Sequence, residues 1–222
     1  MRVLVIGGSG RCGKLVIEEL LNRGHQVTTL VRNPTSMGEA QPGLKIVQGT
    51  PTNLNDVRAA FQADNDIPKV VIVTLSAPRA TDSPFAAPIS PPRLMADCNA
   101  NVVKAMREFH VRKTVILQAF GVGKSWANMH CALRLLMSKS NMIYQYEDHN
   151  QTDREVRESG VDFVMVRPSR LVETDETGAR VWPDDGKGVG LMASTSRLSV
   201  ARWLVDAAET THWDNTAPVI TN

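Results

Sequence analysis

Short apolar runs alternate with amphipathic stretches along most of this chain. The run Val3–Ile6 is followed by a helical pattern over Leu15–Leu21, and the near-continuous apolar run at 69–75 is typical of a strand buried on both faces. Further strands are predicted at 26–31, 44–49, 113–117 and 161–168, with a small extra strand at 178–182. Further helices are predicted at 53–61, 93–109, 126–141, 151–158 and 200–209.

Strands that alternate with helices about every 30 residues predict a parallel sheet covered on both faces. Six such strands joined by right-handed crossovers form a doubly wound α/β sheet of Rossmann type. The 222 residues suit a single domain, 1–222. We expect the segments near 76–95, 119–148 and 168–197 to form loops around a substrate. Within the first of these, the proline-rich stretch 81–92 cannot be helical throughout.

A glycine turn separates the first strand from the first helix. Its sequence is Gly7-Gly8-Ser9-Gly10-Arg11-Cys12-Gly13, with glycines at a spacing of three. Gly7 permits a tight turn, Gly10 lets the backbone approach a pyrophosphate, and Gly13 lets the helix pack close to the strand. The N-terminus of the helix then offers free N–H groups to a phosphate. We therefore predict a dinucleotide site that includes Ser9, Arg11 and Cys12.

The end of the second strand indicates which dinucleotide binds. Proteins that prefer NAD usually carry an acidic residue there, whereas this chain has Arg32 and no acidic residue before Glu39. Arg32 and Arg11 suit a 2′-phosphate, so the pattern favours NADP(H). Because ligands bind at the carboxyl ends of the strands, residues that follow the later strands should border the cofactor. These are Leu75, Ser76, Ala77, Gln118 and Pro168.

Composition and charge exclude several other classes of protein. A net charge of +2 without a basic block does not indicate nucleic acid or an anionic membrane as a partner. The three cysteines show no metal-ligand spacing, there is no Gly-x-Ser-x-Gly motif, and no apolar run is long enough to span a bilayer. We expect a cytoplasmic protein with reduced thiols, no metal and a small-molecule substrate, and we leave its oligomeric state open.

Several patterns, taken in chain order, resemble one family of nucleotide-binding proteins. They are the glycine turn, Val27–Asn33, Glu147–His149, Arg154–Val161 and Val164–Pro168. Together they resemble the atypical short-chain dehydrogenase/reductase proteins of the nitrogen-metabolite-regulator-like group, and within it the flavin reductase/biliverdin reductase B type. The resemblance implies NADPH binding and hydride transfer to an unsaturated or quinoid acceptor.

The chain departs from that family at the residues that usually carry the chemistry. Most members use a Tyr-x-x-x-Lys pair and a Ser, but here Tyr144 and Tyr146 are each followed four residues later by Asp148 and Asn150. The Lys position is occupied by His149 and the Tyr position by Gln145, while Gln118 replaces the hydroxyl residue. His149, Gln118 and Tyr146 are our catalytic candidates. His149 is a candidate either for contact with the nicotinamide ribose or for protonation, since an imidazole can serve as a donor near neutral pH.

Three further side chains, together with Tyr146, are candidates for substrate contact, and three functions remain open. Arg170 suits an anionic group, and Trp126, His130 and Tyr146 suit the wall of a pocket. The leading hypothesis is an NADPH-dependent reductase of a flavin-like or quinone-like acceptor, in which the protein supplies positioning and the cofactor the hydride. The alternatives are an NADP(H)-sensing regulatory protein without catalysis, and a non-redox isomerase or cyclase on the same scaffold.

Overall fold

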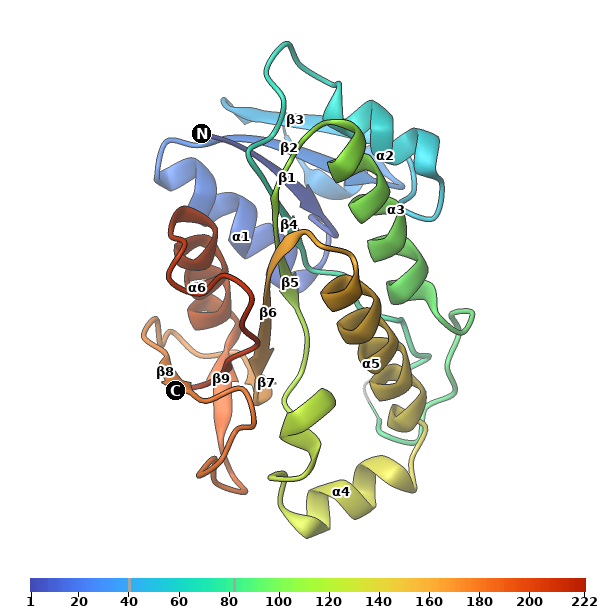
Figure 1. Cartoon of the computed structure of the whole chain (residues 1–222), viewed down its shortest axis with the longest axis vertical. Helices are drawn as coiled ribbons and strands as arrows, with labels where there is room; N and C mark the ends of the chain where they lie inside the picture. The colour runs from blue at the N-terminus through green and yellow to red at the C-terminus, as the bar shows by residue number, and fades with distance from the viewer. Residues whose placement is uncertain (40, 82) are drawn as a thin grey trace.

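One mixed eight-stranded sheet organises the computed structural model, which describes residues 1–39, 41–81 and 83–222 (Figure 1). Its strand order is β3-β2-β1-β4-β5-β6-β10-β8, and every neighbouring pair is parallel except β10 and β8. The strands are β1 (Arg2–Ile6), β2 (Gln26–Val31), β3 (Leu44–Gln48), β4 (Val70–Val73), β5 (Lys113–Leu117), β6 (Asp162–Pro168), β8 (Arg180–Trp182) and β10 (Val219–Thr221). The first six in this order form the predicted doubly wound sheet, so the fold class is confirmed.

Helices cover both faces of the sheet, as Figure 1 shows. On one face lie α1 (Arg11–Asn22) and α6 (Arg197–Glu209); on the other lie α2 (Leu54–Phe61), α3 (Leu94–Glu108) and α5 (Met142–Glu158). Each face has its own apolar core, because β1 and β4 bury alternate side chains on opposite sides of the sheet. This two-sided burial explains why these strands appear in the sequence as continuous apolar runs.

Helix ends follow the local sequence signals. Gly24 has a φ of +76° just after α1, a conformation that stops a helix at low cost for glycine. The Ser196 hydroxyl accepts from the Ser199 N–H at 2.9 Å and caps α6. Asn53 caps α2 through the Asn55 N–H at 2.9 Å.

Two predicted helices have different bounds in the structure. The helix expected over 126–141 is a short 3-10 turn, η2 (Gly123–Trp126), followed by α4 (Cys131–Ser138). The helix expected to begin at 151 begins instead at Met142, so His149 lies within α5 and not before it. The sequence prediction failed here because the buried face of α5 carries polar residues such as Asp148 and Thr152, which weaken the apolar period.

Strands also occur where loops or nothing were predicted. The segment 168–197 contains β7 (Arg170–Val172) and β9 (Ser194–Ser196), which pair in parallel as a separate two-stranded sheet, and β10 extends the main sheet beyond β6. Another 3-10 turn, η1 (Pro34–Met37), follows β2. Each of the three missed strands has three residues, too few for a readable period. Of the predicted proline-rich loop 81–92, residue 82 lies outside the described residues.

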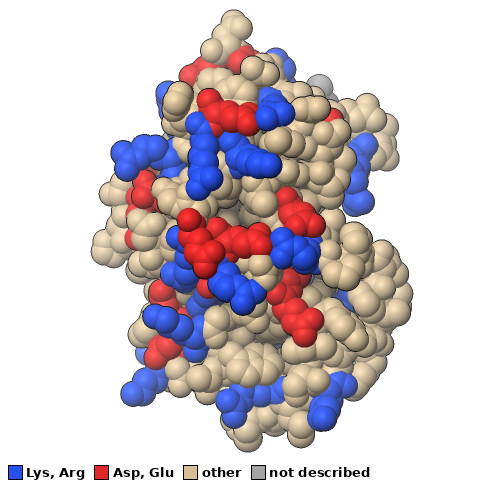
Figure 2. All heavy atoms as spheres, turned by 45° about the vertical axis from the view of Figure 1, so that its right-hand side comes forward, with Lys and Arg blue, Asp and Glu red and all other residues tan. Residues whose placement is uncertain are grey.

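The face formed by α3 and α5 carries charges of both signs. Figure 2, which turns this side forward, shows acidic and basic side chains interleaved across it. Ion pairs join some of them, such as Arg93 with Asp97 and Glu155, both at 3.0 Å. Exposed ion pairs of this kind contribute little to stability.

Candidate active site

The glycine turn packs so closely that a Cβ does not fit at Gly8 or Gly13. Gly7 has a φ of +91°, and the Gly10 N–H donates to its carbonyl at 3.0 Å. A Cβ on Gly13 would lie 2.2 Å from the Gly7 carbonyl oxygen, and one on Gly8 would lie 2.2 Å from the Thr29 hydroxyl. Gly10 precedes α1 and no side chain caps that helix. The turn therefore leaves the first N–H groups of α1 available to a phosphate, and a dinucleotide fits this cradle.

Two cavities meet at the carboxyl edge of the sheet, one on each side of the turn after β4. Both are lined by Leu75, Ser76 and Pro78. Their volumes are about 330 and 400 Å³, within the usual range for small-molecule sites. Together they run along the strand ends where a doubly wound sheet binds an extended ligand.

The cavity on the β2 side contains Arg32. It is also lined by Gly7, Ser9 and the segment Thr50–Thr52. Among the described lining residues Arg32 is the only charged one, and it is exposed. Arg11 lines the other cavity, so the two arginines predicted to suit one phosphate border different cavities.

The cavity on the β5 side holds most of the predicted chemistry. Its lining includes Gly10, Arg11, Cys12, Leu75, Ser76, Ala77, Gln118, Gln145 and His149. Gln145 and His149 are four residues apart and therefore share one face of α5, which they turn toward the cavity. The family's Tyr and Lys positions, counted from the sequence, thus lie at this cavity, where they hold an amide and an imidazole.

His149 is neutral at neutral pH. Burial, and to a smaller extent the charge of Arg167, lower its pKa from 6.5 to about 4. The expectation that His149 donates a proton near pH 7 is therefore corrected, because an imidazole with this pKa is uncharged there. It can still orient a ligand through its ring nitrogens.

The thiol of Cys12 is also uncharged. Burial raises its pKa, and a hydrogen bond with Arg197 and that residue's charge oppose the shift only in part. Arg197 begins α6, lines the same cavity and pairs with Glu173. Nothing in the local sequence pattern around Arg197 indicated this position, because it depends on the packing of α6 beside α1.

Four predicted site residues do not line either cavity. Tyr146 is buried in a separate apolar cluster, where its hydroxyl donates to the Phe120 carbonyl at 3.0 Å and Trp126 packs edge-on at 5.7 Å. We therefore correct the catalytic assignment of Tyr146 and the pocket assignment of Trp126. His130 is an exposed cap of α4, and Arg170 is exposed on β7.

Pro168 also lies outside both linings. It is the buried last residue of β6, pairs with Ile220 of β10, and accepts from the Phe120 N–H at 2.9 Å. The prediction that Pro168 borders the cofactor missed β10, which pairs with the end of β6 and which the sequence did not reveal.

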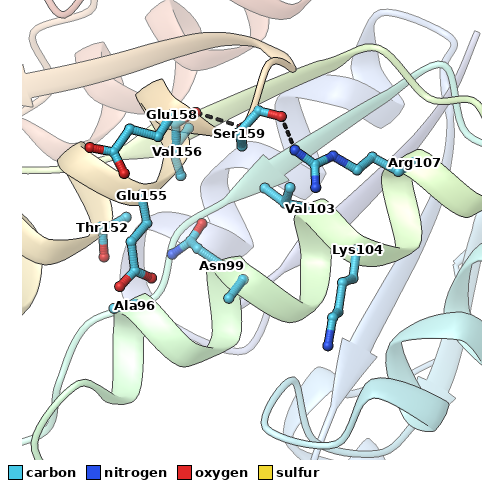
Figure 3. Close-up of a pocket in the computed structure, with 11 residues that line it drawn as sticks. Ala96, Asn99, Val103, Lys104, Arg107, Thr152, Glu155, Val156, Glu158 and Ser159 are labelled. Carbon is cyan, nitrogen blue, oxygen red and sulfur yellow. Dashed lines mark hydrogen bonds between the residues drawn. The ribbon is translucent and has the colours of Figure 1, made fainter.

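A further cavity of about 330 Å³ lies between α3 and α5, as Figure 3 shows. Its wall is formed by charged side chains such as Lys104, Arg107, Glu155 and Glu158, over Ala96 and Val103. Arg107 donates to the Ser159 carbonyl at the end of the cavity where α3 and α5 end. Because α3 and α5 end there and lead into β5 and β6, this end of the cavity lies toward the amino edge of the sheet, away from the glycine turn.

Within the described residues, no group of three or more His, Cys, Asp or Glu side chains could hold a metal ion. None of the described helices combines the length and the apolar character needed to cross a membrane.

Comparison with known proteins identifies the family. The chain matches the family model described as NAD(P)H-binding over residues 7–211, and it belongs to that family. The family and the sheet together define an NAD(P)H-binding protein with a Rossmann-type fold.

Two relatives are similar in sequence. An uncharacterized chloroplastic protein of Arabidopsis thaliana is 28% identical over 212 residues, which cover 93% of this chain and 71% of that protein. A 3-diazoavenalumate denitrifying reductase of a Streptomyces species is 34% identical over 116 residues, which cover 52% of this chain and 36% of that protein.

Many solved structures share the fold, and two of them illustrate the similarity. The anaerobillin reductase ChuY of Escherichia coli O157:H7 superposes with a TM-score of 0.78 at 15% identity, covering 99% of this chain and 96% of that one. A short-chain dehydrogenase/reductase of Veillonella parvula, solved in complex with NADP, superposes with a TM-score of 0.76 at 16% identity over 100% and 94% of the two chains.

Proposed function

We propose that this protein is an NADPH-dependent reductase of a small conjugated acceptor, flavin-like or quinone-like, of the flavin reductase/biliverdin reductase B type. The observation that carries the proposal is the pair of cavities joined at Leu75, Ser76 and Pro78. The glycine turn borders both cavities, so a dinucleotide bound there would place its two halves in different cavities.

Arg32 supports NADP(H) as the cofactor. It follows β2, where an NAD-binding protein would carry an acidic side chain for the ribose diol. A guanidinium there donates two hydrogen bonds to a 2′-phosphate, and no described acidic side chain lines the cavity to repel it. Arg32 would hold the 2′-phosphate of the cofactor, and the N-terminus of α1 would hold its pyrophosphate.

The residues of the cavity on the β5 side support a conjugated acceptor. No Tyr or Lys is among its described lining residues, and His149 is neutral. Such a site lacks the strong proton donor that reduction of an isolated ketone needs. A conjugated acceptor spreads the incoming negative charge over its own atoms and takes its proton from water. Two of the similar proteins are named reductases, which agrees with this chemistry.

The test is oxidation of NADPH, followed at 340 nm, with a panel of flavins, quinones, enones and simple ketones. We expect turnover with at least one conjugated acceptor and none with the isolated ketones. NADPH binding without turnover of any conjugated acceptor would contradict the proposal.

A sensing protein is the second candidate, since the chemical residues of the family are replaced in this chain. A regulatory protein needs only to bind NADPH and NADP with different affinity. Absence of turnover, together with affinities that differ between the two redox forms, would favour this function over reduction.

A further inference from the structure

A fully buried arginine stands behind the cavity on the β5 side. Arg167 lies in β6, within a run of apolar residues, and its side chain is 1% exposed. Its guanidinium donates to the Asp153 carboxylate at 2.6 Å, to the Asp184 carbonyl at 3.0 Å and to the Gln118 side-chain oxygen at 3.4 Å. Burying a charged group is costly even when it is paired, so its contact with Gln118 invites an explanation beyond packing.

These contacts fix which way the Gln118 amide points. Arginine has only donors, so the Gln118 Oε1 atom must face Arg167. At the other end of the amide, Gln118 Nε2 donates to the His149 carbonyl at 3.3 Å, and a carbonyl only accepts. Both neighbours demand the same orientation, so the amide cannot turn over without losing two hydrogen bonds.

The fixed amide presents a donor to the cavity. Gln118 directly follows β5 and lines the cavity although only 4% of its surface is exposed. Its NH2 group carries two hydrogens, and the His149 carbonyl uses one of them. The charge of Arg167 polarises the amide from behind, which strengthens the N–H as a donor.

We propose that Gln118 is a catalytic residue that stabilises the negative charge formed on the acceptor, and that Arg167 is the positioning residue that holds it for this role. The inference rests on the proposed reductase function. Hydride transfer breaks the C4–H bond of the reduced nicotinamide and forms a C–H bond on the acceptor, which takes both electrons. The acceptor's π electrons move onto its carbonyl oxygen, and a proton from water completes the reduction.

The Gln118 N–H donates to that oxygen as the charge develops. A donor held in place before reaction stabilises such a charge without reorganisation. This assigns the site a conjugated carbonyl compound as its class of acceptor. It also explains why the site needs neither an acidic Tyr nor a charged His149.

The experiment compares Gln118→Ala, Gln118→Glu and Arg167→Lys in single-turnover hydride transfer and in NADPH binding. Glutamate keeps an oxygen for Arg167 but has no N–H, so it separates a structural role from a donor role. We expect both Gln118 variants to slow hydride transfer by about tenfold or more, while the Kd for NADPH changes by less than about threefold. Added to the wild type, Arg167→Lys should slow hydride transfer by about fivefold. Added to Gln118→Ala, it should slow hydride transfer by less than twofold, because Arg167 acts through Gln118.

Two controls guard against a general loss of structure. Arg112→Lys makes the same substitution at an exposed arginine, which pairs with Asp162 on the surface, and should leave the rate unchanged. If Arg167→Lys does not fold, Asp153→Asn/Arg167→Gln removes both charges of the pair, with Asp153→Asn alone as its reference.

The apoprotein gives a readout besides activity: the side-chain amide signals of Gln118 in NMR spectra should move in the Arg167 variant and stay unchanged in Arg112→Lys.

The outcomes separate this inference from the function on which it rests. Wild-type turnover with a full rate in Gln118→Glu would overturn the inference and leave the reductase function standing. An equal loss from Arg167→Lys in both backgrounds would overturn the role of Arg167 as the residue that positions Gln118. Absence of turnover by the wild type with every conjugated acceptor would overturn both the function and the inference.

Discussion

Replacement of His149 should make the protein less sensitive to mild acid. In the folded protein burial and the nearby Arg167 disfavour the imidazolium, so the pKa of His149 is about 4, against 6.5 for an ordinary histidine. Unfolding exposes the ring, which then binds a proton readily in this range of pH. Between pH 6.5 and pH 4 the unfolded state therefore binds more protons than the folded state, and the free energy of unfolding falls as the pH falls.

The size of the effect follows from the two pKa values. Because the pKa of His149 is lowered by folding, its contribution to the free energy of unfolding is fully present above about pH 6.5. That contribution is lost as the pH drops toward 4. The loss amounts to about 2 kcal/mol between pH 7 and pH 5 and about 3 kcal/mol at pH 4. Such a loss is a large fraction of the stability of a typical domain.

Urea denaturation at several pH values measures this directly. Because other groups titrate in the same range, the informative quantity is the difference between the wild type and His149→Gln, which has no titrating ring. We expect the variant to lose about 2 kcal/mol less than the wild type between pH 7 and pH 5. His212→Gln, at an exposed histidine, is the matched control and should follow the wild type. Parallel curves for the wild type and His149→Gln would refute the reasoning.

Three further predictions test the cofactor site and the scaffold behind it. Arg32→Ala should raise the Kd for NADPH about tenfold or more and leave that for NADH within about threefold, measured by calorimetry. Gly13→Ala should weaken NADPH binding and cost about 2 kcal/mol of stability, because its Cβ would lie 2.2 Å from the Gly7 carbonyl oxygen. Gly190→Ala is its control, since nothing lies within 4 Å there. Asp148→Ala should cost about 3 kcal/mol in urea denaturation, because the buried carboxylate accepts from the Met95 and Ala96 N–H groups at the start of α3. An unchanged midpoint in that variant would show that the cap contributes little.

The parts of the fold that could be predicted are those whose signal is local. The first glycine turn combines a strand, three spaced glycines and a helix within a few residues, and Gly7 and Gly13 prove to be positions where a side chain does not fit. The central strands are buried on both faces and therefore stand out as apolar runs. The strands β7, β9 and β10 have only three residues each and are held by pairing with distant segments, which no local pattern records.

The site was predictable only as far as its position along the strand ends. The order of elements placed Gln118 and His149 at the cavity: Gln118 directly follows β5, and His149 lies one turn after Gln145 on α5. The sequence could not show that Tyr146 turns into an apolar cluster instead, since that depends on the side of α5 facing Phe120. Arg167 did carry a signal, a charged residue inside an apolar strand, but its meaning required the contact with Gln118.

Titration of the purified protein with NADPH, NADP, NADH and NAD tests the proposed cofactor site most directly. We expect NADPH to bind in the micromolar range and NADH at least tenfold more weakly, a difference of about 1.4 kcal/mol that Arg32 supplies. Equal affinity for NADPH and NADH would contradict the role of Arg32. Absence of binding by all four nucleotides would contradict the reductase and the sensor alike.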